Sequence, residues 1–360
     1  MSDFIIRDSQ AGDLAGIAAL QRDAGPELQL PPAEYFPFWQ WLCQRNPGGA
    51  AKSLVGIDGA GQVIAHKAMV PFPVVCDGQN LTGGLPCQYV VAVPFRATPV
   101  YLQMDVRLLA EYPQKGIDFF CGISRARYVR VDESLRFFGF RVVGRLPVYA
   151  RPYRLVNLAR HYLGGGWRYQ TLKPLLHAAE WPLRICLSRS TRRADVTQID
   201  AFDDATATSL EAVCQQLGVH TRRSAAWLNW RFFQCPDRAY QVHLARDSKS
   251  ALGYIALRQM RMRDFDALAV VDIVFPPDRP EVGRALLRQA HCVALETRVD
   301  LAACMFNPAS SLLPVLRWSG FLRTPDGFSM IVHQPKGAAP LIDAQTFQRW
   351  HLTWLEHDYV

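Results

Sequence analysis

The stretch LRFFGF at residues 135–140 returns, with changes, as LRWSGF at residues 316–321, and its glycines Gly139 and Gly320 are 181 residues apart. Three further landmarks recur upstream of each stretch, at separations of 183, 183 and 189 residues. They are a cysteine in a hydrophobic run (Cys121 and Cys304), a proline after a strand-like run (Pro94 and Pro277) and a proline that closes a tryptophan-rich segment (Pro47 and Pro236). Repetition over this length indicates duplication of a whole domain rather than a solenoid of short units.

The composition is that of a folded protein of about two domains. Hydrophobic residues make up 49% and charged residues 20% of the 360 positions, which is unlike a disordered chain. No uncharged apolar tract reaches the ~18 residues that a bilayer-spanning helix needs, and residues 1–8 lack the basic leader and apolar core of a signal peptide. We therefore expect a cytoplasmic protein without a transmembrane segment.

The cysteines and the net charge restrict the kinds of site and partner that we expect. The nine cysteines are scattered, odd in number and never arranged as Cys-x-x-Cys, which argues against a disulfide framework and against a metal site. The formal net charge of +8 favours an anionic partner, because excess Lys and Arg attract phosphate-bearing molecules over long range. A phosphorylated cofactor, a nucleotide sugar, an anionic lipid surface and RNA all fit this charge, and so does a basic protein with no charged partner.

The hydrophobic pattern predicts the same order of elements in residues 1–150 and again in residues 195–335. For the first copy the expected elements are a strand at 4–7, helices at 13–20 and 35–45, strands at 53–58, 63–70, 72–76 and 88–93, a helix at 100–112, a strand at 117–123, a helix at 134–138 and a strand at 140–148. This order predicts an α+β fold: two similar domains, each a mixed, mostly antiparallel sheet flanked by helices.

Two segments lie outside the repeat. Residues 151–194 are predicted to be a basic linker with an amphipathic helix at 155–163, and either a solvated connector or a docking surface for a membrane-linked or anionic substrate fits that composition. Residues 336–360 are predicted to contain one C-terminal helix at 344–356. Four of its side chains are expected to pack on the second domain: Phe347, Trp350, Leu352 and Trp354.

The element order, and the Gly-Phe that closes each copy, resemble those of the GNAT superfamily of acyl-CoA-dependent N-acyltransferases, here as a tandem pair. In that family the fourth strand runs into a loop of pattern Val-x-Pro-x-x-Arg/Gln-x-x-Gly-x-Gly/Ala and then into a helix. Backbone N–H groups of the loop and the helix N-terminus hold the pyrophosphate of coenzyme A. The resemblance implies acetyl-CoA or another acyl-CoA as the donor, and no metal.

In the first copy, Val91 and Arg96 match this loop pattern, whereas Pro99 stands where the family has glycine. A proline removes one backbone donor and fixes φ, so a weaker phosphate cradle is expected. The resemblance implies cofactor contacts from Val93, Arg96 and Ala97.

In the second copy, Pro277, Gly283 and Ala285 match the pattern, and Pro280 replaces the expected Arg or Gln. Two neighbouring arginines are close enough in sequence to supply the missing charge. The cofactor contacts implied for this copy are Phe275, Arg279, Gly283, Arg284 and Ala285.

Acyl transfer needs a base whose pKa lies near the working pH. The family's usual acid, a tyrosine four residues before the closing glycine, is replaced by Leu135 and Leu316. Three candidate catalytic residues lie near the expected cleft: Asp272, Tyr128 and His66. Each also has an ordinary structural interpretation, as a locally bonded carboxylate, a packed loop tyrosine and a half-exposed strand histidine.

These features favour a transferase that moves an acyl group, with acetyl preferred, from acyl-CoA to an amine or hydroxyl of a small molecule or glycan, such as a sugar or polysaccharide precursor. One copy is expected to hold the donor while the other shapes the acceptor cleft. Two alternatives stay open. One is a FemAB-like transferase that takes its acyl group from aminoacyl-tRNA, and the other is a non-catalytic module whose cradles have decayed. No DNA partner is expected.

Overall fold

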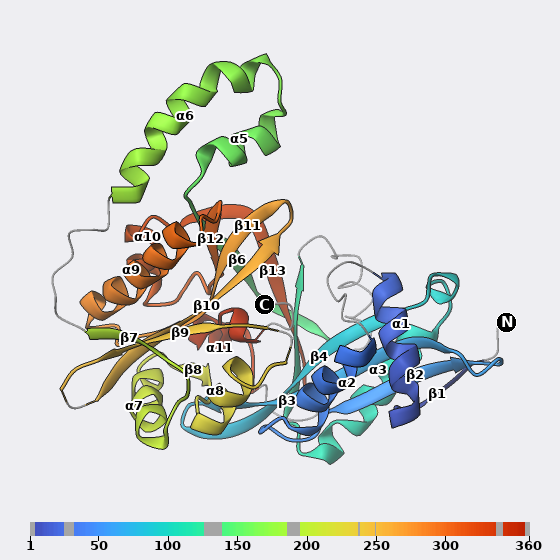
Figure 1. The fold of residues 1–360 in the computed structure, drawn as a ribbon. Coiled ribbons are helices and arrows are strands. Elements are labelled where there is room, and N and C mark those ends of the chain that lie inside the picture. Colours follow the sequence, from blue (N-terminus) through green and yellow to red (C-terminus); the bar gives the residue numbers. More distant parts are fainter. Residues whose placement is uncertain are drawn as a thin grey trace.

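A computed structural model describes residues 4–24, 32–125, 139–185, 195–236, 238–248, 250–335 and 341–356. Within these ranges, fourteen strands form one sheet that runs through both copies, and helices cover its faces (Figure 1). A pair of helices between the copies stands away from this body. None of the helices within these ranges combines the length and the hydrophobicity that spanning a bilayer requires.

The first copy follows the predicted order. Its helices and strands are β1 (Phe4–Asp8), α1 (Leu14–Ala24), α2 (Pro32–Trp39), β2 (Lys52–Asp58), β3 (Val63–Cys76), β4 (Gln79–Val91), α3 (Val100–Glu111), β5 (Phe119–Arg125) and β6 (Arg141–Pro152). The segments expected at 63–70 and 72–76 are one strand, β3, which turns into β4 through Asp77 and Gly78. Both turn residues have positive φ, 49° and 77°, as a tight hairpin turn requires. The helix predicted at 134–138 lies outside the described residues.

The segment between the copies is largely helical. It contains α5 (Leu155–Leu163) and α6 (Trp167–Ile185), joined by three glycines. We predicted the first of these helices and missed the second. The α6 sequence mixes apolar and polar residues around the whole helix, so it shows little of the one-sided pattern by which a surface helix is recognised.

The second copy repeats the architecture with short additions. Its helices and strands are β7 (Asp195–Ile199), α7 (Asp204–Gln215), β8 (Val219–Thr221), α8 (Ala225–Phe232), β9 (Gln241–Arg246), β10 (Ala251–Met262), β11 (Phe265–Val274), α9 (Pro280–Glu296), β12 (Leu301–Met305), α10 (Leu313–Trp318), β13 (Leu322–His333), α11 (Ala344–Gln348) and β14 (Trp350–His351). Helix starts are marked in the sequence: Asp203 Oδ1 accepts from Thr206 N at α7, and Ser224 Oγ accepts from Trp227 N at α8.

The prediction of a single helix over residues 344–356 is wrong. After the short α11, the chain becomes extended as β14 and ends, within the described residues, in a 3₁₀ turn at Trp354–Glu356. The extended backbone is fixed by parallel pairing of Trp350 and His351 with β8, which overrides the helical pattern. The four side chains expected to pack on the second copy are all buried, but two of them also contact the first copy: the Trp350 ring lies against Phe119, and the Phe347 ring lies against Gly144.

The two copies exchange their last strands. The order along the sheet is β1-β2-β3-β4-β5-β13-β6-β12-β11-β10-β9-β7. Strand β13 of the second copy therefore pairs with β5 of the first, and β6 of the first copy pairs with β12 of the second. Each copy completes the other's sheet, so neither is expected to be stable alone.

An approximate two-fold relation joins the copies at two tryptophans that are 189 residues apart. Trp41 Nε1 donates to Trp230 O (2.8 Å), and Trp230 Nε1 donates to Trp41 O (2.9 Å). Their rings stack with centroids 4.6 Å apart. The separation equals that of Pro47 and Pro236, so equivalent residues of the two copies meet each other. The core accordingly extends without interruption across the junction.

Candidate functional site

In both copies the fourth and fifth strands begin together and then diverge. Strand β4 pairs in parallel with β5 at Gly83 and Gly84, and the pairing stops there although β4 continues to Val91. In the second copy, β11 pairs with β12 from Ala267 to Ala269 and continues to Val274 without β12, paired only with β10. This divergence opens a gap beside the loop that leads into the next helix.

A β-bulge lies in the same place on both diverging strands. In β4, Gln88 and Tyr89 together stand opposite the single residue Lys67, and Gln88 has a φ of 54°. In β11, Val271 is the extra residue, and it lies 183 positions after Gln88. Bulges bend a strand and redirect its groups, and they are frequent beside active sites. The duplication therefore preserved this irregularity as well as the regular elements.

An apolar pocket lies against the bulge of the first copy, between the two copies. The pocket is small and partly open to solvent. Residues from α2 and the turn after it, β3, β4, β8, α8 and the C-terminal turn line it; they include Phe38, Trp41, Phe72, Gln88, Trp227, Trp230, Arg231 and Glu356. Two buried polar atoms among these residues, Gln88 Oε1 and Trp227 Nε1, have no hydrogen-bond partner among the described residues.

Glu356 is the acidic residue of this pocket and was not among the predicted site residues. Its Oε1 accepts from Thr221 Oγ1 (2.7 Å) and its Oε2 accepts from Thr353 N (2.9 Å). Burial raises the pKa of the Glu356 carboxyl to about 7, and the nearby charge of Asp272 acts in the same direction. A carboxyl with this pKa exchanges a proton readily near neutral pH. The sequence carries no local sign of it, because the acid reaches the pocket from the far end of the chain.

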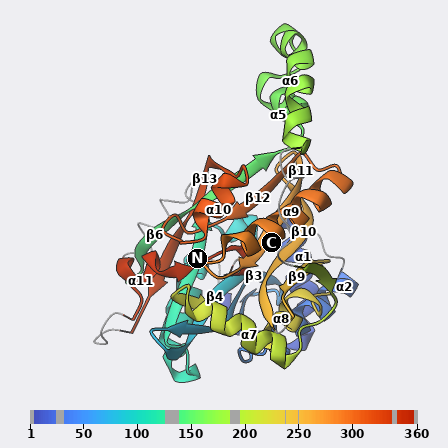
Figure 2. The ribbon, with the colours of Figure 1, turned by 90° about the vertical axis from the view of Figure 1, so that its left-hand side faces the viewer.

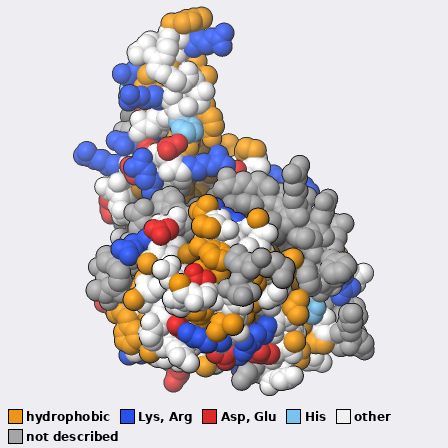
Figure 3. All heavy atoms as spheres, turned by 90° about the vertical axis from the view of Figure 1, so that its right-hand side faces the viewer, with side chains coloured by type: hydrophobic (Ala, Val, Ile, Leu, Met, Phe, Trp, Pro, Cys, Tyr) orange, Lys and Arg blue, Asp and Glu red, His pale blue; other side chains and the backbone are white. Residues whose placement is uncertain are grey.

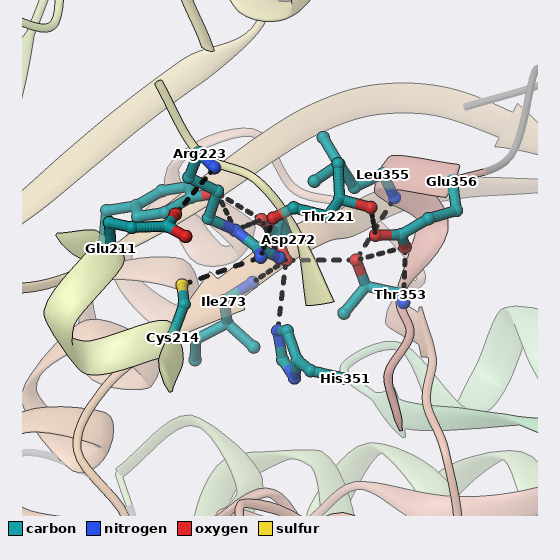
Figure 4. A network of polar contacts seen from close by, with 11 residues as sticks. Glu211, Cys214, Thr221, Arg223, Asp272, Ile273, His351, Thr353, Leu355 and Glu356 are labelled. Atoms are coloured by element: carbon teal, nitrogen blue, oxygen red, sulfur yellow. Dashed lines mark hydrogen bonds and ion pairs between the residues drawn. The ribbon is translucent and has the colours of Figure 1, made fainter. Parts of the chain in front are cut away.

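Asp272 lies in the second copy, at the centre of a buried polar network (Figure 4). Arg223 Nη2 is 3.0 Å from Asp272 Oδ2, Tyr254 donates to the same oxygen, and Thr353 Oγ1 donates to Oδ1 (3.0 Å). His351 Nε2 lies 3.5 Å from Oδ1. Burial alone would raise the pKa of Asp272, but the charge of Arg223 and the contacts from His351 and Tyr254 together outweigh it and hold that pKa well below its usual range. Asp272 is therefore a fixed anion that is poorly suited to accept a proton.

Thr353 connects this network to Glu356. Its hydroxyl donates to Asp272 while its backbone N–H donates to the Glu356 carboxylate. The side chain of Asp272 thus holds the turn that carries Glu356, which lines the pocket; Figure 4 shows the contacts that run from Asp272 through Thr353 to Glu356.

His66 is fully buried on β3, next to the bulge of the first copy. Its Nδ1 lies 2.9 Å from Gln88 O and its Nε2 lies 3.0 Å from Ser53 Oγ. Burial lowers the pKa of His66 to about 4, so the ring is neutral at pH 7. With Nδ1 protonated, the imidazole donates to the carbonyl of the bulged residue and supports its unusual backbone.

The loop after β4 is exposed and carries little negative charge. Val93 is 66% exposed and begins a 3₁₀ turn, followed by the exposed Arg96 and Ala97. Arg96 Nε donates to Val91 O (3.2 Å), which places the guanidinium beside the end of β4. Helix α3 has no acidic residue in its first turn and no side chain capping its N-terminus. Its first backbone N–H groups therefore remain available to an anion.

The loop after β11 is built differently. Phe275 is fully buried, and its ring fills the place that a side chain at Gly283 would occupy, 2.5 Å from an added Cβ. Arg279 Nε is 3.3 Å from Glu281 Oε1, in the first turn of α9. Arg284 lies over the exposed ring of Trp318, and Ala285 is half-buried. Gly283 therefore makes room for the Phe275 ring, and Glu281 places a negative charge in the first turn of α9.

Tyr128, the third predicted catalytic residue, lies outside the described residues. Within those ranges no group of three or more His, Cys, Asp or Glu side chains is placed to hold a metal ion.

Several solved structures share this arrangement of strands and helices. Yeast (Saccharomyces cerevisiae) N-myristoyltransferase with bound myristoyl-CoA matches with a TM-score of 0.63 at 9% identity, over 92% of this chain and 83% of that one. A GCN5-related N-acetyltransferase from Anabaena variabilis matches with a TM-score of 0.60 at 13% identity, over 91% and 72%. A conserved protein of Enterococcus faecalis, called a probable N-acyltransferase, matches with a TM-score of 0.60 at 12% identity, over 96% and 74%.

No protein-family model and no curated protein matches the sequence. At identities this low, the structural likeness is one of fold. The chain has the GNAT fold in tandem, as its sequence predicted.

Proposed function

We propose that the protein is an acyl-CoA-dependent N-acyltransferase whose working site lies in the first copy. The observation that carries this proposal is that two features border the same apolar pocket. They are the bulge of β4 and the Glu356 carboxyl, whose pKa is about 7. The donor molecules named for the solved structures of this fold, among them myristoyl-CoA, support an acyl-CoA as donor.

The donor is proposed to bind across the gap between β4 and β5. Its pyrophosphate would lie at the N-terminus of α3, near Arg96, where backbone donors are uncapped and the first helical turn holds no acid. Its pantetheine arm would follow the diverging edge of β4 toward the bulge at Gln88. Arg96, Val93 and Ala97 are the proposed contacts, and the second-copy loop is proposed to have a structural role.

The acceptor is proposed to be an amine with an apolar body. Glu356 takes a proton from the attacking nitrogen, a C–N bond forms at the thioester carbonyl, and the C–S bond breaks to give a thiolate. The proton held by Glu356 then passes to the sulfur, which leaves as the thiol. Gln88 Oε1, which lacks a partner among the described residues, would accept a hydrogen bond from the amine. The aromatic lining favours an apolar acceptor over a sugar, because an unpaired sugar hydroxyl would be costly to bury there.

A thermal-shift series with acetyl-, octanoyl- and myristoyl-CoA tests the donor. Binding to the folded state must raise the melting temperature by mass action, and the chain length that raises it most identifies the acyl group. Release of free thiol with a panel of apolar amines then tests the reaction. Absence of any shift at millimolar acyl-CoA would contradict the proposal. Activity with aminoacyl-tRNA that ribonuclease abolishes would establish the FemAB-like alternative instead.

A further inference from the structure

The helical hairpin of α5 and α6, here called the arm, projects from the body (Figures 1 and 2). Its two helices pack on each other through the buried Tyr169 and Glu180, whose Oε1 accepts from Val156 N (3.0 Å). The rest of the α6 surface up to residue 179 is exposed apart from the half-buried Leu176. The arm thus uses one side of α6 for its own packing and leaves the other side to the surroundings.

The outer surface of the arm is unusually apolar. Trp167 is 73% exposed, Tyr162 68% and Leu175 67%. Trp167 and Leu175 are eight residues apart on α6 and therefore lie on one face of the helix. Of the fourteen exposed large hydrophobic side chains among the described residues, five belong to this arm. So large a share on one projecting hairpin indicates a contact surface rather than scattered surface residues.

The same arm is basic. It carries Arg160, Arg168, Lys173 and Arg184, and its one acidic residue, Glu180, is buried in the hairpin. The Arg168 guanidinium lies 5.7 Å from the ring of Trp167, so positive charge and aromatic surface occur side by side. Figure 3 shows hydrophobic side chains at the end of the arm, with basic ones nearby. Aromatic rings beside basic side chains are typical of protein surfaces that rest at a bilayer interface.

The arm is held to the body at both ends of α5. Asn157 Nδ2 donates to Asp300 Oδ1 (2.6 Å) near its start. Close to its end, His161 Nδ1 lies 3.3 Å from Asp264 Oδ2, and the His161 ring packs on Phe265 with centroids 4.8 Å apart. These contacts keep the exposed surface in a fixed direction, which lowers the entropic cost of docking.

We propose that the arm docks the protein on an anionic lipid bilayer. Trp167 and Leu175 enter the boundary between headgroups and acyl chains, while Arg160 and Arg168 contact lipid phosphates. The charge also argues against a second copy of this chain as the occupant, because two arms of the same sign repel each other. This proposal stands on the arm alone and does not depend on the reaction proposed above.

Vesicle co-sedimentation tests the docking. The full chain should bind phosphatidylglycerol–phosphatidylcholine vesicles and bind pure phosphatidylcholine vesicles far more weakly. Changing Arg160 and Arg168 together to Gln should weaken binding about 25-fold, since each basic residue near an anionic surface contributes about fivefold. The Trp167→Ser/Leu175→Ser variant should weaken it at least about tenfold, because the lost apolar burial is large. Quenching by brominated lipids, compared between the wild type and Trp167→Phe, reports whether the Trp167 ring enters the bilayer.

The matched control is Ile5→Ser/Leu322→Ser, which removes two side chains of the body that are 61% and 64% exposed. It should bind vesicles like the wild type. Equal binding to both vesicle types, or an arm variant that binds unchanged, would overturn the proposal. So would a dimer in sedimentation equilibrium that Trp167→Ser/Leu175→Ser dissociates, because the arm would then be a contact between copies.

Discussion

The two copies share a frame but differ at the place where each fourth strand bulges. In the first copy the bulge at Gln88 faces an apolar pocket. In the second, the residue after the bulge is Asp272, and the space around it is filled by Arg223, Tyr254 and the C-terminal tail. After duplication the strand geometry was therefore kept in both copies, whereas one gap became part of the core. The filled copy now supports the open one by holding the turn that carries Glu356.

The loops that follow these strands also differ, and again it is the first copy that leaves room for an anionic ligand. The first turn of α3 has no acid, and Arg96 beside it is exposed. The first turn of α9 holds Glu281, which pairs with Arg279, and the glycine of that loop is packed against a buried ring. An anionic donor should therefore choose the first copy, and the comparison makes predictions that can be ordered by size.

The largest effect is expected for Glu356→Gln. A general base contributes about 10²- to 10⁴-fold, so kcat/KM should fall by that factor. In the wild type, kcat/KM should rise about tenfold per pH unit up to about 7, where the carboxyl loses its proton, and then level off. The variant should lose this rise. Steady-state kinetics between pH 5 and 9 measure both effects, and Glu281→Gln in the filled copy is the matched control.

The same substitution has a signature in stability. The pKa of Glu356 is about 7 in the folded protein against an ordinary value of 4.5, so the folded state binds the extra proton between these values. The free energy of unfolding should then decrease as pH rises from about 4.5 to 7. In urea titrations, the free energy of unfolding should differ less between pH 5 and pH 8 in Glu356→Gln than in the wild type. An identical pH dependence in both proteins would contradict the assignment.

The next effect concerns the filled copy. Asp272→Asn leaves the buried Arg223 without its counter-ion and should cost about 3–5 kcal/mol in urea unfolding. Since the charge of Asp272 raises the pKa of Glu356, the variant should also move the rise in kcat/KM to lower pH. The double variant Arg223→Met/Asp272→Asn should recover part of the lost stability. A catalytic loss without either shift would make Asp272 a direct participant in the reaction.

The sequence predicted the frame well because duplication and strand patterning are local or periodic signals. The offset between Trp41 and Trp230 even marked two residues that meet, although nothing in the sequence showed that they do. The exchange of β6 and β13 was not predictable, since both strands carry the same pattern and the choice of partner depends on distant packing. Glu356 was missed for a related reason: its pKa comes from burial against residues more than 80 positions away.

A smaller effect distinguishes the two candidate pyrophosphate-binding loops, which follow β4 and β11. Arg96→Glu should weaken acyl-CoA binding about tenfold, because it puts an exposed negative charge beside the proposed pyrophosphate site. Arg279→Glu, the matched change in the second copy, should alter the dissociation constant less than about twofold. Isothermal titration with the acyl-CoA that gives the largest thermal shift measures both. The opposite ranking would place the donor in the second copy and reverse the comparison of the loops.

The smallest effect tests the symmetry itself. Trp41→Phe and Trp230→Phe each remove an indole N–H that donates to the partner's carbonyl, so each should cost about 1 kcal/mol of unfolding free energy. Because the two bonds are equivalent, the single costs should agree closely, and the double variant should show coupling through the shared ring stack. Trp227→Phe is the control for the lost ring volume, since its buried Nε1 has no partner among the described residues, and it should cost less than either of the other two changes. Unequal costs for Trp41 and Trp230 would mean that the junction between the copies is asymmetric in energy, as the gaps beside β4 and β11 are in structure.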